Sequence, residues 1–348
     1  MTASSLTIRA LGAHVRVAFG DAVPGDVVAR ARRAWSGAST ASDREDRLVD
    51  VPTVLDADDF LQHLSTSVTL EALSHGRGRL MMLHAAGVAM EDGRVLAFVG
   101  PSGRGKTTLS RALAQRFGYV SDETIAFDRD LNVLPYRKPL SVVRDGRPKD
   151  QVAPEDAGLR ELPDVPLRLA GIVLLDRDAS AESVTVEHLP FAVAAPELVT
   201  QTSYLMELPG TVRTLAELCE RAGGVRRLRY AEATDVPDMI DELLVADPEP
   251  ETWAALTLRV RDAVGSVVPA DAVDYGDVLV TLSERTLRVL DGIAPTILRH
   301  AQRSEEDITA AVVDRFGAPP HGDATAIVRG AIDELREAGF VIGGAHGE

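Results

Sequence analysis

The most informative segment of this chain is Gly100-Pro101-Ser102-Gly103-Arg104-Gly105-Lys106-Thr107. It matches the pattern G-x-x-x-x-G-K-[ST] at every fixed position. Glycines allow the backbone to turn its N–H groups inward around an anion. A helix that begins at Lys106 would point its positive end at the same anion. The segment therefore predicts a P-loop that binds the phosphates of a nucleotide.

The residues on either side of this loop have the pattern of a strand followed by a helix. Val95–Val99 is a continuous apolar run, as expected of a buried strand. Apolar residues then recur at i, i+4 and i+8, which predicts a helix over Thr107–Phe117. In this setting Lys106 is expected to reach the outer phosphates of ATP, and the Thr107 hydroxyl to ligate Mg²⁺. The alternative interpretation is a glycine-rich turn that happens to precede a helix.

The composition predicts a reduced, cytoplasmic protein of more than one domain. A chain of 348 residues is too long for one ordinary core, and Cys219 alone allows no intrachain disulfide. The net charge of −16 disfavours binding to nucleic acid, which needs cations against phosphates, and disfavours a polybasic membrane surface. Neither a signal peptide nor an apolar run of about 20 residues is found. No nucleic-acid or membrane partner is therefore expected.

Residues 1–75 are expected to form a small N-terminal α/β subdomain. Partial alternation over Leu6–Phe19 predicts two short strands around Gly12, and Asp59–Leu73 has helical spacing. Residues 76–246 then have the alternating pattern of the P-loop domain. Further buried strands are predicted at Leu80–Met90, Ile125–Phe127 and Ile172–Leu175, and further helices at Leu215–Ala222 and Val236–Leu244.

A domain boundary is predicted near Ala246–Pro250, which is acidic and contains two prolines. Residues 247–269 are interpreted as a linker with a short helix, because apolar residues recur at helical spacing over Trp253–Val264. Residues 270–348 are expected to form another domain, with two strands joined by the turn Ser283–Arg285 and then three helices. The helices are expected to begin near Pro295, at Ser304 and at Asp323.

Four segments between Leu80 and Leu244 have to be considered together. They are Leu83-His84-Ala85-Ala86-Gly87-Val88, the P-loop, Gly118-Tyr119-Val120-Ser121-Asp122-Glu123 and Val133-Leu134-Pro135-Tyr136. Together they resemble HPr kinase/phosphorylase and its HPr-kinase-like relatives. The resemblance implies a kinase core that phosphorylates a serine hydroxyl. It also implies that Asp122 is the general base or hydroxyl-orienting group, that Glu123 lies near Mg²⁺, and that His84 lies beside the phosphate site.

Further site residues are predicted around this core. Asp176, at the end of a predicted strand, has the form of a Walker B acid and is a candidate Mg²⁺ ligand with Thr107 and Glu123. The expected nucleotide-binding residues are Gly100, Ser102, Gly103, Gly105, Lys106, Thr107 and Thr108. The structural alternatives are a core role for His84 and turn roles for Asp122, Glu123 and Asp176.

The chain also departs from the kinase family that it resembles. Asp122-Glu123 stands where that family has two adjacent aspartates, and Pro101-Ser102 stands where its loop usually has Asp-Ser. The downstream phosphorolysis signature of the family is not found. Neither HPr as the substrate nor the reverse reaction is therefore implied.

The segment Asp274–Val341, with two strands and three helices, resembles PqqD and related precursor-recognition domains of ribosomal peptide pathways. The resemblance implies a winged-helix fold in which the leader of a precursor peptide adds as a strand to the sheet edge. The expected peptide-binding residues are Thr286, Leu287, Arg288, Val289, Leu290, Ile327, Val328, Ala331 and Ile332. DNA binding is the alternative for such a fold, but Asp333, Glu334 and Glu337 make the last helix acidic.

The predicted fold is therefore α/β, with a P-loop, HPr-kinase-like core, a small N-terminal α/β lead-in and a C-terminal winged-helix, PqqD-like domain. The leading hypothesis is an ATP-dependent peptide Ser/Thr kinase whose C-terminal domain tethers the leader and raises the effective concentration of the core peptide. The competing hypothesis is a recognition protein that delivers the precursor to other enzymes of the pathway. A third hypothesis is regulation through HPr-like proteins.

Overall fold

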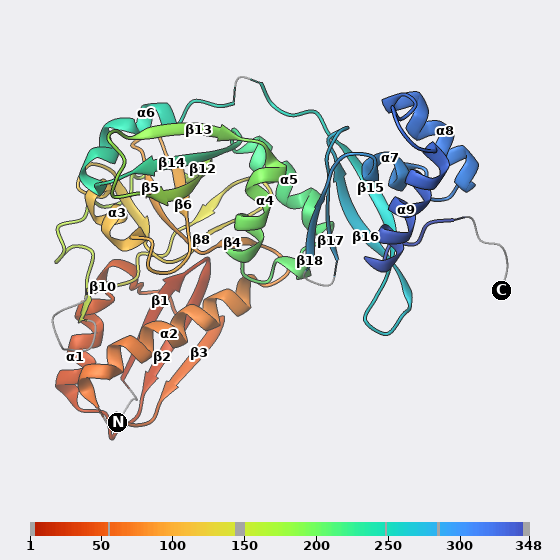
Figure 1. Ribbon diagram of the computed structural model, residues 1–348. Helices are drawn as coiled ribbons and strands as arrows, with labels where there is room; N and C mark the ends of the chain where they lie inside the picture. Colours follow the sequence, from red (N-terminus) through yellow and green to blue (C-terminus); the bar gives the residue numbers. More distant parts are fainter. Residues whose placement is uncertain (1–3, 55, 143–149, 248, 284–285, 344–348) are drawn as a thin grey trace. The chain divides into compact units, whose positions relative to one another are not determined.

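The computed structural model describes residues 4–54, 56–142, 150–247, 249–283 and 286–343 (Figure 1). The chain divides into two compact units. The first combines Met1–Leu208 with Leu218–Pro248, and the second combines Pro209–Glu217 with Glu249–Glu348. Within the described ranges, no helix has both the length and the apolar character that a membrane span requires.

The first unit begins with a small three-stranded sheet in the order β1-β2-β3. Its strands are β1 (Ser4–Ala10), β2 (Ala13–Phe19) and β3 (Arg47–Val51), with β1 antiparallel to β2 and β2 parallel to β3. Leu11 and Gly12 join the first two strands with φ angles of 49° and 81°. Positive φ at both central residues is what a two-residue hairpin turn of type I′ requires. The prediction of two strands around Gly12 is confirmed.

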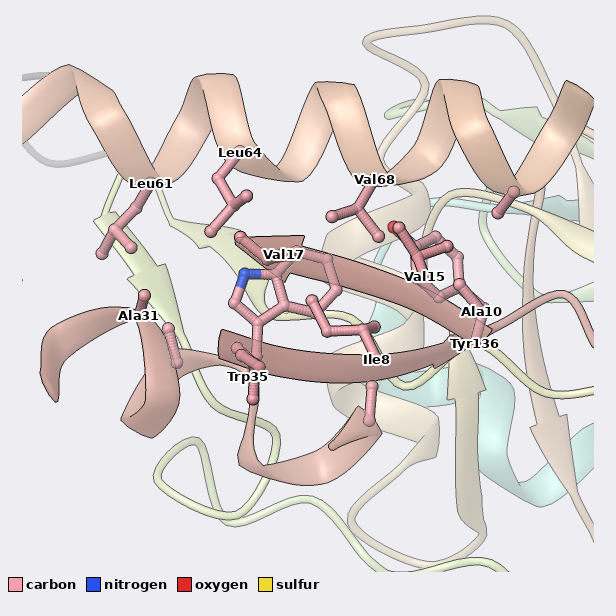
Figure 2. Close-up of a cluster of buried hydrophobic side chains, with 14 of the residues drawn as sticks. Ile8, Ala10, Val15, Val17, Ala31, Trp35, Leu61, Leu64, Val68 and Tyr136 are labelled. Carbon is pink, nitrogen blue, oxygen red and sulfur yellow. The ribbon is translucent and has the colours of Figure 1, made fainter. Parts of the chain in front are cut away.

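Helix α2 (Ala57–Gly76) covers one face of this sheet, as predicted from the helical spacing of Asp59–Leu73 (Figure 2). Leu64 and Val68 point from the helix toward the strands, and Trp35 lies below them. Trp35 follows α1 (Gly25–Ala34) and precedes the short 3-10 helix η1 (Ser36–Ala38). Its ring stacks on Tyr136 at 6.2 Å, which joins the small sheet to the rest of the unit.

The centre of the first unit is a mixed six-stranded sheet in the order β13-β14-β12-β6-β5-β7. The parallel strands are β6 (Arg94–Val99), β12 (Arg168–Arg177) and β14 (Val225–Tyr230). Strands β5 (Ala85–Ala89) and β13 (Thr185–Leu189) run antiparallel to these three, and the edge strand β7 (Gly118–Ser121) pairs antiparallel with β5. The interior of β6 is fully buried, as expected of a strand covered on both faces. The predicted mixed α/β class is therefore correct.

Two smaller sheets and several helices complete the first unit. The strands are β4 (Met81–Leu83), β8 (Ile125–Phe127), β9 (Val133–Leu134), β10 (Leu140–Val142) and β11 (Asp150–Val152). The helices are α3 (Lys106–Leu113), α4 (Phe191–Thr200), η2 (Leu205–Glu207), α5 (Thr211–Arg221), η3 (Ala233–Met239) and α6 (Ile240–Leu243). Helix α5 begins in the second unit, to which it belongs up to Glu217, and ends in the first.

Two expectations for this unit need correction. The apolar run Leu80–Met90 is two strands rather than one, because the chain leaves one sheet and enters another at His84. The helix predicted over Val236–Leu244 begins as the 3-10 helix η3 and becomes α-helical only at Ile240. Pro237 lies inside η3 and has no N–H for an α-helical hydrogen bond.

The second unit contains a four-stranded antiparallel sheet and three helices. The strands, in sheet order, are β15 (Ala254–Arg261), β16 (Val267–Asp274), β17 (Leu279–Ser283) and β18 (Thr286–Leu290). The helices are α7 (Ala294–Arg299), α8 (Glu305–Phe316) and α9 (Ala324–Glu337). Ser304 and Asp323 cap α8 and α9 as predicted, each accepting a backbone N–H through its side chain. The predicted turn residues Glu284 and Arg285 lie outside the described residues.

The helix predicted over Trp253–Val264 is wrong, because this segment contains strand β15 and the turn after it. Leu258 and Val260 are buried on one face of β15, and Arg259 between them is exposed. Val264, which the helix interpretation placed on the apolar side of the helix, is 86% exposed. The alternation of buried and exposed side chains, typical of a strand, therefore describes this segment better than the looser helical spacing of its apolar residues.

Candidate nucleotide-binding site

The P-loop connects the carboxyl end of β6 to the first turn of α3. Gly103 and Gly105 have φ angles of 85° and 87°, in the left-handed region that favours glycine. A Cβ atom added at Gly103 would meet no neighbour within 4 Å, so the backbone conformation rather than packing requires glycine there. The glycines of the motif therefore shape the loop, as the sequence predicts.

A cavity of about 520 Å³ lies beside this loop, within the usual range for small-molecule sites. It is lined by His84, Ser102, Gly103, Gly105, Lys106, Thr107, Thr108, Arg111, Asp122, Glu123, Lys138, Ser141 and Val142. The cavity brings the loop residues together with His84, Asp122 and Glu123, which come from other parts of the chain. Gly100 is not part of the lining, but its carbonyl accepts a hydrogen bond from Lys106.

Lys106 is the buried cation of the loop. Its side-chain Nζ donates hydrogen bonds of 2.5 Å and 3.1 Å to the carbonyls of Gly100 and Pro101. Burial lowers the pKa of Lys106 to about 8, with Asp122 and Glu123 acting in the opposite direction. The side chain therefore remains mostly protonated at pH 7 and can face a phosphate.

His84 lies between β4 and β5, where the chain changes sheets. Its backbone N–H donates a 2.7 Å hydrogen bond to the carbonyl of Gln201. Burial lowers the pKa of the imidazole, and the nearby charge of Lys106 lowers it further. His84 therefore lines the cavity as a neutral ring rather than as a second positive charge.

The two candidate acids follow directly after β7. Asp122 is 5% exposed, and its Oδ1 atom accepts a 3.0 Å hydrogen bond from the hydroxyl of Tyr119. Lys138 contacts both acids, with its Nζ atom 2.7 Å from Oε2 of Glu123 and 3.7 Å from Oδ1 of Asp122. Burial lowers the pKa of Lys138, but the two carboxylates outweigh it and the net shift is upward.

Lys138, Tyr119 and Arg111 were not predicted as site residues. No recognisable motif surrounds Lys138 in the sequence. Tyr119 lies in an apolar segment, where an aromatic side chain is expected to belong to the core. Arg111 lies one helical turn after Thr107, so the helical spacing of α3 could have identified it. For Lys138 the sequence carries no comparable signal, because its contacts to Asp122 and Glu123 join separate segments. Tyr119 lies only three residues from Asp122, but its spacing alone does not indicate a hydrogen bond to that acid.

The predicted Mg²⁺ ligands are only partly brought together. Thr107 and Glu123 line the same cavity, but Asp176, at the end of β12, is not among the lining residues. Within the described ranges, no group of three or more His, Cys, Asp or Glu side chains could hold a metal by itself. Mg²⁺ commonly binds through one or two protein oxygens together with substrate phosphates, so a hydroxyl and a carboxylate fit its chemistry.

The residues predicted to bind a peptide divide into an exposed and a buried group. Strand β18, Thr286–Leu290, is an edge strand, and Val289 on it is 43% exposed. Ile327 on α9 is 46% exposed, whereas Val328 and Ile332 are each 1% exposed and belong to the core. The prediction that Val328 and Ile332 face a peptide is corrected accordingly.

The remaining candidates of this group also lie at the surface or near it. Ala331 is partly buried against the core of the second unit, and Leu287 and Leu290 on β18 have intermediate exposure. Arg288 lies 5.7 Å from the ring centre of Phe340 and donates a hydrogen bond to Ser283. The described surface therefore offers the strand edge and a few apolar side chains.

Comparisons with known proteins give partial matches to nucleotide-binding proteins. A probable anion import ATP-binding protein of Haloferax volcanii is 49% identical over 80 residues, 23% of this chain and 27% of that protein. Cytidylate kinases of Geobacter sp. (strain M21) and Symbiobacterium thermophilum are 40% identical over 75 residues and 33% identical over 139 residues. These two matches cover 22% and 39% of this chain, and 28% and 57% of the two kinases.

This chain thus spans between about a quarter and just over half of the length of these relatives. No family model matches the chain. The named relatives are ATP-binding or nucleotide-kinase proteins, and a P-loop is typical of proteins of these classes. The partial similarities support a P-loop nucleotide-binding fold and the binding of ATP.

Proposed function

We propose that this protein transfers the γ-phosphoryl group of ATP to the hydroxyl of a peptide Ser or Thr. One observation carries the proposal: a single cavity is lined by the P-loop, by the cation of Lys106 and by the buried carboxylate of Asp122. Phosphoryl transfer needs little else from a protein than positioned phosphates and a group that receives the hydroxyl proton.

The phosphates would be held by the loop and by the start of α3. The backbone N–H groups of the loop and the positive end of the helix favour an anion there. Lys106 would pair with the outer phosphates, and Ser102 and Thr108 line the same cavity. Thr107 and Glu123 would hold Mg²⁺, which neutralises charge on the transferring group when it is bound.

Asp122 would act on the acceptor hydroxyl. The acceptor oxygen forms a bond to the γ-phosphorus, and the bond from that phosphorus to the bridging oxygen breaks, so that ADP leaves. The acceptor proton passes to the Asp122 carboxylate and then to solvent. The neutral ring of His84 lies beside the phosphates without competing with Lys106 for negative charge.

We further propose that the second unit, with a winged-helix, PqqD-like fold, holds the leader of a ribosomally made precursor peptide. The leader would add as a strand to β18, Thr286–Leu290, and would contact exposed apolar side chains such as Val289 and Ile327. At the other side of this sheet, β15 is already paired through Arg259 and Arg261 with the segment Gly339–Val341. That pairing supports β18 as the docking edge.

A recognition protein that binds ATP without transferring phosphate is the second candidate. Two observations favour it: Asp176 does not line the cavity, and Glu123 is paired with Lys138. Both leave Mg²⁺ with few ligands from the described residues. In this case the protein would deliver the precursor to other enzymes of the pathway.

Turnover separates the two candidates. The full-length protein is incubated with Mg²⁺, γ-labelled ATP and a library of Ser- and Thr-containing peptides, and labelled peptides are identified by mass spectrometry. We expect transfer by the wild type and a fall of about 100-fold or more in Asp122→Asn, with ATP still bound. Asp130→Asn, an exposed acid on the same segment, is the matched control and should transfer normally. ATP binding without transfer to any peptide would favour the recognition protein.

A further inference from the structure

Lys138 is a buried cation in the wall of the nucleotide cavity. It lies between β9 and β10, and 5% of its side chain is exposed. Its ammonium group contacts Glu123 at 2.7 Å and Asp122 at 3.7 Å. The ammonium group of Lys138 therefore lies close to both the Asp122 and the Glu123 carboxylate, on the side of the cavity where the acceptor would bind.

Asp122 is constrained at one of its two oxygens. The hydroxyl of Tyr119 donates to Oδ1 at 3.0 Å, and Lys138 faces the same oxygen. Tyr119 is fully buried on β7, the strand that leads into Asp122. Both of these contacts are therefore made at Oδ1 of Asp122. Oδ2 is the oxygen left for a group in the cavity.

The other cations of the cavity do not contact this carboxylate pair. The ammonium group of Lys106 donates to the loop carbonyls of Gly100 and Pro101, and Arg111 is exposed on α3. The buried carboxylate of Asp122 beside the half-buried carboxylate of Glu123, with no cation in contact, would be costly, and the pair would repel the phosphates of a nucleotide. Lys138 is therefore the cation in direct contact with the pair, and Lys106 acts on the two acids only at longer range.

We infer that Lys138 is a positioning residue for phosphoryl transfer, which fixes the Asp122 carboxylate through Oδ1 so that Oδ2 receives the acceptor proton. The inference rests on the proposed phosphoryl transfer. In the step, the acceptor O–H bond breaks toward Oδ2 as the new bond to phosphorus forms and ADP departs. Lys138 touches no reacting atom and transfers no proton.

The test measures ADP release from Mg·ATP by the full-length protein, with water as the acceptor. Lys138→Met keeps the length of the side chain and removes its charge. We expect kcat to fall about 100-fold, while KM and the calorimetric affinity for ATP change by less than about threefold. Lys138→Arg should recover about tenfold of this loss, because it restores a cation near both acids.

A double-mutant cycle separates positioning from a purely structural role. In the Asp122→Asn background, Lys138→Met should cause no further loss of rate, because the group on which Lys138 acts is already absent. Arg137→Met is the matched control. Arg137 is also buried, but it pairs with Glu155 outside the cavity, so its loss should lower the melting temperature and leave the rate of the folded protein unchanged.

Two results would overturn the inference while leaving the proposed function intact. One is a folded Lys138→Met protein that releases ADP at the wild-type rate. The other is a loss that is equally large in the wild-type and Asp122→Asn backgrounds. If the wild type binds ATP but neither releases ADP nor labels a peptide, the proposed transfer itself fails, and the role of Lys138 fails with it.

Discussion

Lys106 is the residue on which ATP affinity should depend most. It is 6% exposed and is the only lysine of the P-loop. Hydrogen bonds to charged groups contribute about 1.5–3 kcal/mol, which corresponds to about tenfold to 100-fold in affinity. We expect Lys106→Ala to weaken ATP binding by this amount in titration calorimetry.

The matched control for Lys106 is Arg104, a second cation of the same loop. Arg104 is exposed and is not part of the cavity lining, so Arg104→Ala should leave ATP affinity within about threefold of the wild-type value. Equal losses in the two variants would show that only the net charge of the loop matters. Unchanged affinity in Lys106→Ala would remove this loop as the phosphate site.

Cys219 should be unreactive in the folded protein. It is 3% exposed on α5, and burial raises the pKa of its thiol to about 12. At pH 8 the reactive thiolate is therefore almost absent in the folded state, whereas an unfolded chain has a thiol pKa of about 8.5. We expect iodoacetamide to leave the native protein unlabelled at pH 8 and to label it fully in denaturant. Rapid labelling of the native protein would contradict the burial of Cys219.

Individual site residues differ in how far the sequence could predict them. The loop residues are fixed by local backbone needs, such as the positive φ angles of Gly103 and Gly105, so a motif is sufficient. Lys138 is different, because its contacts to Asp122 and Glu123 join residues that are about 15 positions apart along the chain. No local pattern records such a pair, so only the folded sheet could reveal it.

At the scale of elements, the strands and helices that are bounded by capping residues or glycines were the most predictable. Helices α8 and α9 begin after capping residues and end near glycines, so the sequence predicts where each helix begins and ends. Strand β15 was missed because the helical spacing of Trp253, Leu256, Val260 and Val264 was followed, and this spacing leaves out the buried residue Leu258. A short amphipathic segment without capping residues can fit both the period of two of a strand and the period of 3.6 of a helix. In such a segment, pairing with another strand decides whether a strand or a helix forms.

The cap of α8 gives a prediction at this scale. The Ser304 hydroxyl accepts the backbone N–H of Asp307 at 3.1 Å, and that N–H has no partner within the helix. Ser304→Ala should destabilise the second unit by about 1 kcal/mol. The free energy of unfolding is measured by chemical denaturation and followed by circular dichroism.

Thr309→Ala is the matched control for the cap. Thr309 also makes a side-chain hydrogen bond, to the carbonyl of Glu305, but this carbonyl lies inside α8. Alanine is the better helix former there, so the stability should change by less than about 0.5 kcal/mol. A larger loss in Thr309→Ala than in Ser304→Ala would contradict the role of the cap.

At the scale of the whole molecule, the division of the chain follows sheet pairing more closely than composition. Residues 247–269 are polar and proline-containing enough to be interpreted as a linker, yet they include β15 and the start of β16. These strands pair along their full length, from Ala254 opposite Asp274 to Arg261 opposite Val267. Each of the two segments has only a weak strand pattern in the sequence, and neither pattern by itself indicates that the two strands pair.

The same pairing predicts where an independently folding fragment must begin. A fragment of residues 249–348 keeps β15 and lacks only Pro209–Glu217 of the second unit, whereas one of residues 270–348 loses β15 as well. Leu258 and Val260 are each 4% exposed, and burial of such side chains contributes about 1.5–3 kcal/mol each. Small domains have about 5–15 kcal/mol in total, so the loss of both side chains removes a large part of the stability.

We therefore expect the fragment 249–348 to melt cooperatively in circular dichroism and the fragment 270–348 to show no cooperative transition. The shorter fragment also leaves Phe340, which pairs with Val260 across β15, without its partner strand. Leu258→Ala in the longer fragment is the intermediate case and should lower its melting temperature without abolishing the transition, because β15 still pairs with β16. If both fragments melt at the same temperature, β15 contributes nothing to the core of the second unit, and the boundary near residue 270 that the sequence predicts is the correct one.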